Sequence, residues 1–95
     1  MVGGRLHGLA YTRAALAFLE KHVPHKVRRQ IGRKIRALMG DPHPPGSKLL
    51  QNVMDGKNRV YRVRSGDYRV LYSVRPDQIV VLDIDNRKDV YRGTT

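Results

Sequence analysis

The sequence predicts a small α+β domain in which two N-terminal helices pack on one face of a mostly antiparallel, twisted sheet. Three observations predict this fold class. Apolar residues recur at helical spacing in the N-terminal half, and alternating or β-branched runs fill the C-terminal half. The length of 95 residues is enough for one domain and too short for two. We therefore expect a single domain over residues 1–95, with the element order β-α-α-β-β-β.

The N-terminal part predicts a strand followed by a helix. We expect the strand over residues 5–11. Thr12 can then act as the N-cap of the helix, because its side-chain oxygen can accept a hydrogen bond from a free backbone N–H. Ala15, Leu16 and Leu19 follow at helical spacing, which predicts that they form the apolar stripe.

A second helix is predicted after Pro24, which suits a first helical turn. Its apolar residues recur at i, i+4, i+8 and i+11, and its polar side is basic. That basic side is either an ordinary solvated surface or a docking surface, and the sequence leaves both open. Residues 41–47 form a proline-rich loop, and residues 48–56 are assigned to neither helix nor strand. The apolar residues are Val27, Ile31, Ile35 and Leu38, and the basic ones are Lys26, Arg28, Arg29, Arg33, Lys34 and Arg36.

Residues 59–72 give the strongest local signal, a β-hairpin of two alternating strands with a two-residue loop at 65–66. In that register, Arg62 lies directly opposite Arg69. Like charges at that spacing repel, so we expect this face of the sheet to bind an anion. One face carries Arg62, Arg64 and Arg69, and the other carries the core residues Tyr61, Val63, Tyr68, Val70, Tyr72 and Val74.

Residues 79–84 are a β-branched apolar run, which predicts a central strand. Its register is open, because one residue more or less in the preceding turn exchanges the two faces. The hydrophobic pattern favours one orientation. It directs Val80, Leu82 and Ile84 toward the helices and Val81 and Asp83 toward the arginines.

Net charge is the strongest signal in the composition. Lys and Arg number 19 against 8 Asp and Glu, which gives a formal net charge of +11. A field of that sign attracts polyanions, so we expect a nucleic acid, a ribosome or an acidic protein as partner. The absence of cysteine fits a reducing cytoplasm, and no apolar run is long enough to span a membrane. The spacing of the four histidines matches no metal site.

The element order, the GDYRVLY segment at residues 66–72 and the NRKDVYR segment at residues 86–92 together resemble the RelE/ParE superfamily of bacterial toxins. The resemblance extends over about residues 5–92, and the RelE branch looks closer. It implies a single RelE-like toxin domain that cuts messenger RNA on the ribosome, inhibits translation and is neutralised by a cognate antitoxin. The ParE branch instead inhibits DNA gyrase without nucleolytic chemistry.

The resemblance also implies which residues act. Asn86 stands where many relatives have histidine, so proton transfer by such a histidine is not available here. Only residues 92–95 follow Tyr91, so we expect no final helix. A purely structural role for Arg87 is a surface ion pair with Asp85 or Asp89. The implied catalytic residues are Arg62, Arg64, Arg69, Arg87 and Tyr91, and the implied RNA-binding residues are Arg59, Arg62, Arg64 and Lys88.

Metal-free RNA cleavage uses the ribose 2′-OH as nucleophile against the adjacent phosphate. It needs a base for that hydroxyl, cations for the negative charge and a partner for the leaving 5′-oxygen. Guanidinium suits phosphate because it is planar and permanently charged, but its pKa makes it a poor proton donor. We therefore expect Arg87 to stabilise the leaving oxygen, and Tyr91 to act as base or to orient the 2′-OH. Neighbouring arginines favour tyrosinate and would lower the pKa of Tyr91.

Three functions remain open from the sequence. The first is a ribosome-dependent messenger-RNA endoribonuclease of a type II toxin–antitoxin system, which requires no metal or organic cofactor. The second is a ParE-like inhibitor of DNA gyrase. The third is a basic nucleic-acid-binding module, although the sequence offers no exposed aromatic platform for stacking bases. The expected location is the cytoplasm, and the expected partners are a cognate antitoxin, the ribosome, messenger RNA and operator DNA, with no membrane.

Overall fold

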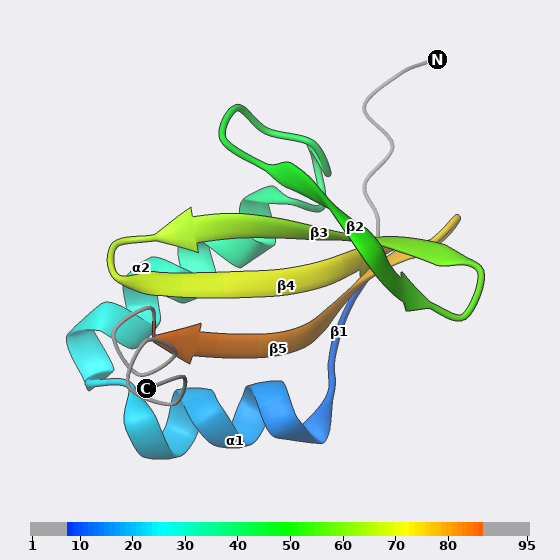
Figure 1. The fold of residues 1–95 in the computed structure, drawn as a ribbon. Coiled ribbons are helices and arrows are strands. Elements are labelled where there is room, and N and C mark those ends of the chain that lie inside the picture. The colour runs from blue at the N-terminus through cyan, green and yellow to red at the C-terminus, as the bar shows by residue number, and fades with distance from the viewer. Residues whose placement is uncertain (1–7, 87–95) are drawn as a thin grey trace.

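The computed structural model describes residues 8–86 of the chain, and within them the predicted fold class is confirmed (Figure 1). Two helices follow a short first strand, and four further strands complete the described part. In chain order the elements are β1 (Gly8–Tyr11), α1 (Arg13–His22), α2 (His25–Ala37), β2 (Lys48–Asp55), β3 (Asn58–Ser65), β4 (Tyr68–Val74) and β5 (Gln78–Asn86).

The strands form one sheet in the order β1-β5-β4-β3-β2, which is antiparallel except where β1 pairs with β5. Helix α1 packs against β5 and α2 packs against β3, so both helices cover the same face (Figure 1). The core lies between that face and the helices. Its buried residues are Ala15, Leu19, Val23, Ile31, Ile35, Leu38, Val63, Val70, Tyr72, Ile79, Val81 and Ile84.

The first helix begins as the sequence predicts. The Oγ1 atom of Thr12 accepts a hydrogen bond from the Ala15 N–H at 3.2 Å, which caps α1. The same hydroxyl donates a hydrogen bond to the Leu82 carbonyl oxygen at 2.6 Å, so the cap also joins the helix to β5. The predicted apolar stripe of α1 is wrong at Leu16, whose exposed fraction is 45%, whereas Leu19 is only 6% exposed.

Strand β2 is the one element that the sequence does not predict. It lies at the edge of the sheet and is exposed along most of its length. Asn52 has a φ of 66°, and the pairing with β3 shifts between Leu49 and Met54. A bulged edge strand with little buried surface loses the alternation that marks a strand, which explains why no pattern is visible in its sequence.

The β3–β4 hairpin is confirmed, but the predicted loop is wrong by one residue. Residues 66–67 make the turn, so Arg64 rather than Arg62 lies opposite Arg69. Gly66 has a φ of 59°, which glycine adopts without strain and which the first central position of a type II′ turn requires. Moving the turn by one residue moves each partner by two, so the two faces keep their predicted residues. The remaining pairs are Val60 opposite Ser73, Tyr61 opposite Tyr72, Arg62 opposite Leu71, Val63 opposite Val70 and Ser65 opposite Tyr68.

The predicted orientation of β5 is wrong in its first half. A β-bulge places Leu82 between two paired residues and reverses the alternation of the strand. Val81 and Ile84 therefore both belong to the helix-facing core, whereas Val80 does not. Asp83 lies on the side of the arginines, as expected, because it pairs with Leu71 rather than with a core residue.

A polar cluster joins the end of β2 to β4. The Asp55 carboxylate accepts hydrogen bonds from Ser73 Oγ at 2.8 Å and from Arg75 Nη2 at 2.6 Å. Ser73 is fully buried, so its hydroxyl depends on this acceptor. The hydrogen bond from Arg75, and then that from Ser73, hold the pKa of Asp55 below its ordinary value of 3.8.

We expect Asp55 to make folding stability depend on acid pH. A carboxyl whose pKa is lower in the folded state contributes stability that is complete above its unfolded pKa and is lost as pH falls through the folded value. Denaturant unfolding measured between pH 7 and pH 3 should therefore show that the free energy of unfolding falls more steeply with decreasing pH for the wild type than for Asp55→Asn. At pH 7, Asp55→Ala should cost about 1–3 kcal/mol, because it leaves the Ser73 hydroxyl buried without this acceptor.

Asp77→Asn is the matched control, since Asp77 is an exposed carboxylate in the turn before β5. Its unfolding free energy should follow the wild type at every pH. Equal pH profiles for Asp55→Asn and the wild type would contradict the role of the cluster.

Candidate functional site

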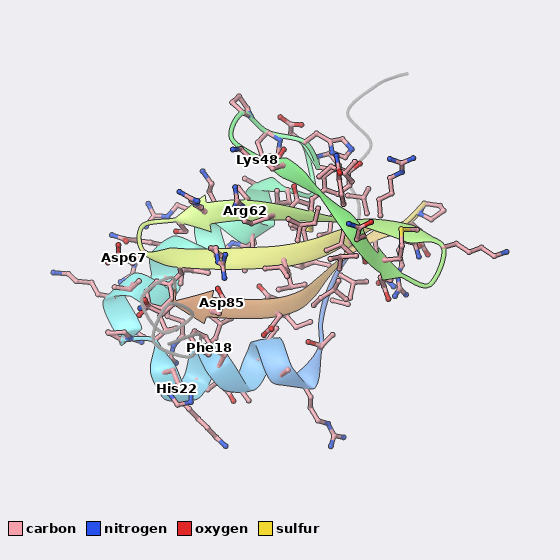
Figure 2. The ribbon with its side chains drawn as sticks, viewed as in Figure 1. Phe18, His22, Lys48, Arg62, Asp67 and Asp85 are labelled. Atoms are coloured by element: carbon pink, nitrogen blue, oxygen red, sulfur yellow. The ribbon has the colours of Figure 1, made fainter. Side chains whose placement is uncertain are left out.

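The candidate site is the arginine face, which we define as the sheet surface that carries Arg62, Arg64 and Arg69. It is the face turned away from the helices, because the alternate residues of β3 and β4 belong to the core. Figure 2 shows Arg62 on β3 and Lys48 on the neighbouring β2. Lys48 lies directly opposite Arg62 in the sheet and so adds a fourth cation. The sequence could not reveal Lys48, because β2 carries no strand pattern.

Arg69 is held in an ion pair that the sequence does not predict. It lies opposite Asp85 across β4 and β5. Its Nε donates to Asp85 Oδ1 at 3.0 Å and its Nη2 donates to Oδ2 at 3.2 Å. The side chains are 24% and 28% exposed, so the pair remains accessible from solvent. The two hydrogen bonds fix the guanidinium plane and offset its charge, and the remaining N–H donors of Arg69 have no hydrogen-bond partner among residues 8–86.

Arg62 differs from Arg69 in having no ion pair among residues 8–86. Its Nε is buried and has no hydrogen-bond partner within the same residues. The Nε atoms of Arg28 and Arg75 are in the same state, so this feature is not specific to the arginine face. Arg64 is exposed, and it too has no ion pair in the described part of the chain.

Arg59 does not join the other predicted RNA-binding residues of β3. It is exposed and lies opposite Met54 near the start of the strand. Alternation along β3 directs its side chain to the other side of the sheet from Arg62 and Arg64. The three remaining predicted residues, Arg87, Lys88 and Tyr91, lie outside the described residues.

The described tyrosines are structural, as predicted for those of the hairpin. Tyr72 is fully buried and donates a hydrogen bond to the Pro42 carbonyl oxygen at 2.7 Å. Burial raises its pKa to about 12. Burial also raises the pKa of Tyr11, against a smaller opposite effect of Arg36. A raised pKa disfavours tyrosinate, so neither phenol is suited to act as a base at neutral pH.

Residues 8–86 contain no group of three or more His, Cys, Asp or Glu side chains placed to hold a metal ion. None of the described helices is long and apolar enough to cross a membrane.

Comparison with known proteins identifies the fold and the family. Residues 9–91 match the family described as "ParE toxin of type II toxin-antitoxin system, parDE". Toxin RelE3 of Methanocaldococcus jannaschii is 31% identical over 71 residues, which cover 75% of this chain and 81% of that toxin.

Three solved structures share the fold. The archaeal RelE–RelB complex from Pyrococcus horikoshii gives a TM-score of 0.73 at 25% identity, over 86% of this chain and 96% of that one. The RelBE2 toxin–antitoxin complex of Mycobacterium tuberculosis gives 0.71 at 24% identity, over 86% and 92%. The RelB–RelE complex of Methanococcus jannaschii gives 0.68 at 21% identity, over 90% and 99%. The chain therefore belongs to the RelE/ParE superfamily of toxins of type II toxin–antitoxin systems.

Proposed function

We propose that the chain is a ribosome-dependent endoribonuclease that cleaves messenger RNA and thereby inhibits translation. The arginine face carries this proposal, because it gathers four cations, Lys48, Arg62, Arg64 and Arg69, on one surface of the sheet. A phosphodiester has the charge and the acceptor oxygens that such donors bind. The relationship to Toxin RelE3 supports the RelE-type activity.

In the proposed reaction, the ribose 2′-oxygen forms a bond to phosphorus and the bond from phosphorus to the 5′-oxygen breaks. The products are a 2′,3′-cyclic phosphate and a 5′-hydroxyl. Arg62, Arg64 and the free donors of Arg69 bind the phosphate and stabilise the charge that grows on it. Tyr91 takes the proton from the 2′-OH, and Arg87 stabilises the leaving 5′-oxygen, which takes a proton from water. No step requires a metal or an organic cofactor.

The ribosome supplies part of the rate in this proposal. A tyrosine with a pKa near 10 is only ~0.1% ionised at pH 7, so the free protein should be slow. A ribosome that holds the message for in-line attack lowers the barrier by orienting the reacting atoms. The physiological partner that blocks the reaction is a cognate antitoxin, as in the RelE–RelB complexes of the same fold. The pair acts in the cytoplasm and binds its operator DNA.

A ParE-like activity is the second candidate, because the family that matches residues 9–91 is described as a ParE toxin. In that case the target is DNA gyrase, and the arginine face binds an acidic protein surface rather than RNA. Asn86 in place of histidine fits a loss of nucleolytic chemistry.

One experiment separates the two functions. The full chain is added to a translating extract, and the 5′ ends of the message are mapped. Cuts that appear only on ribosome-bound message are expected. Intact message together with blocked DNA supercoiling would exclude the nuclease and favour the gyrase inhibitor.

We expect Tyr91→Phe to lower the rate of cleavage at least tenfold, because it removes the proposed proton acceptor and keeps the ring. The measurement is single-turnover cleavage of ribosome-bound message. Tyr68→Phe is the control, since Tyr68 packs against the core and its loss of a hydroxyl should leave the rate unchanged. Full activity of Tyr91→Phe would remove this tyrosine from the role of base.

A further inference from the structure

The arginine face has an acidic border on β5, which the binding of a phosphate does not require. One row of cross-strand neighbours runs over the sheet from Lys48 to Arg62, then to Leu71 and to Asp83. Residues directly opposite one another on neighbouring strands share a face, so Asp83 lies on the same surface as the cations. Two strand spacings separate the backbones of Arg62 and Asp83, which is about 10 Å. The row therefore carries positive charge at one end and negative charge at the other.

No cation neutralises the Asp83 carboxylate within residues 8–86. Asp85, the other acid of this border, accepts two hydrogen bonds from Arg69, whereas Asp83 takes part in neither of the ion pairs formed by the described residues. Asp83 is exposed, and its Oδ1 accepts a hydrogen bond from the Ile84 backbone N–H at 2.9 Å. That bond orients the carboxylate, while Oδ2 accepts no hydrogen bond from another described residue. An oriented acceptor thus faces solvent beside the cations.

A carboxylate in this place is compatible with RNA if it contacts a hydrogen-bond donor of the RNA. A phosphodiester offers acceptors only, and its charge repels Asp83. The bases differ, because adenine, cytosine and guanine each carry an exocyclic amino group. Asp and Glu side chains accept hydrogen bonds from such groups, as they do from N4 of cytosine.

Leu71 provides the surface between the two charges. It is partly buried and lies opposite Arg62 on one side and Asp83 on the other. A base that covers Leu71 removes apolar surface from water. In that position the phosphate of the nucleotide lies toward Arg62 and the edge of its base lies toward Asp83.

We propose that Asp83 is a specificity-determining residue, which accepts a hydrogen bond from the exocyclic amino group of an RNA base lying on Leu71. The inference rests on the proposed binding of RNA by the arginine face, and it adds which bases that face selects. Cytosine and uracil provide the sharpest comparison, because cytosine has an amino donor at the position where uracil has a carbonyl acceptor. The arginine face should therefore prefer cytosine to uracil.

The test measures binding of the full chain to two fluorescently labelled oligonucleotides, 2′-O-methyl hexacytidylate and 2′-O-methyl hexauridylate. The methyl group blocks the 2′-oxygen, so neither can be cleaved by attack of that oxygen. Fluorescence anisotropy at neutral pH and low salt gives the two dissociation constants, and the readout is their ratio. A change in net charge alters both constants alike, so it cancels in the ratio.

The variant is Asp83→Asn, which keeps a side-chain oxygen for the Ile84 N–H and places an amino donor where the second carboxylate oxygen was. Asp77→Asn is the matched control. It removes the same charge from an exposed turn before β5, outside the arginine face.

The wild type should bind the cytidylate about five- to tenfold more tightly than the uridylate. Asp83→Asn should reduce this ratio to less than about twofold, and Asp77→Asn should leave it unchanged. Equal affinities in the wild type, or a ratio that survives in Asp83→Asn, would overturn the proposal. The outcome is separate from that of the proposed function. A protein that keeps the preference but makes no cuts on the ribosome would exclude the nuclease alone, and cutting by a protein without the preference would exclude the role of Asp83 alone.

Discussion

Arg69→Ala should lower the rate of cleavage of ribosome-bound message by about ten- to a hundredfold, or about 1.4–2.7 kcal/mol. The substitution removes a cation from the arginine face. It also leaves the Asp85 carboxylate without the two hydrogen bonds that it now accepts at 3.0 and 3.2 Å. An unpaired negative charge beside the RNA phosphate then adds repulsion to the lost attraction. The measurement is single-turnover cleavage, with thermal unfolding of the variant as the check on folding.

A double-mutant cycle with Asp85→Asn separates these two effects. The single Asp85→Asn variant keeps the Arg69 charge and should cleave within about threefold of the wild type. The double variant should be more active than Arg69→Ala, because the unpaired carboxylate is gone. An unchanged rate for Arg69→Ala would mean that the Arg69–Asp85 pair stabilises the sheet and does not contribute to cleavage. If the double variant were no more active than Arg69→Ala, repulsion by Asp85 would make no contribution.

Leu19→Ala should reduce the free energy of unfolding by about 2–5 kcal/mol, because it leaves a cavity where α1 packs on the sheet. Domains of this size have a total stability of about 5–15 kcal/mol, so the loss is a large fraction. Each kcal/mol should lower Tm by about 4–8 °C. The measurement is denaturant unfolding at neutral pH. If the variant unfolds in two states, its unfolding free energy should fall with denaturant concentration at the same slope as that of the wild type.

The same substitution one turn earlier is the control. Leu16 is 45% exposed and Leu19 is 6% exposed, although both belong to the stripe that the sequence predicts. Leu16→Ala should change the unfolding free energy by less than about 0.5 kcal/mol. Similar costs for the two variants would contradict the packing of α1 against β5.

The arginine face could be predicted from the sequence because it depends only on alternation within β3 and β4. The predicted loop was wrong by one residue, yet this error moved each cross-strand partner by two and left both faces unchanged. Arg62, Arg64 and Arg69 therefore share a face as predicted, although a different pair lies directly opposite. The N-cap at Thr12 was also predictable, because capping depends on a few consecutive residues.

Features that depend on pairing between distant strands could not be predicted. The bulge at Leu82 reverses the alternation of β5, and nothing in its apolar run marks the extra residue. The partner of Arg69 follows from the register of β4 against β5, so Asp85 could not be distinguished from the other acids of the C-terminal segment. Lys48 belongs to an exposed, bulged edge strand, whose position is set by its pairing with β3 rather than by its own sequence.

The parallel pairing of β1 with β5 has a consequence for biosynthesis. Among residues 8–86, the strand Gly8–Tyr11 pairs only with Gln78–Val81, which follows it by 70 positions in the sequence. The hydrogen bond from the Thr12 hydroxyl likewise cannot form before Leu82, its acceptor 70 positions later, has been synthesised. During translation, α1 and α2 can form early, but the sheet cannot be completed until β5 has left the exit tunnel of the translating ribosome. A nascent chain thus lacks the Arg69–Asp85 pair until β5 has left the tunnel.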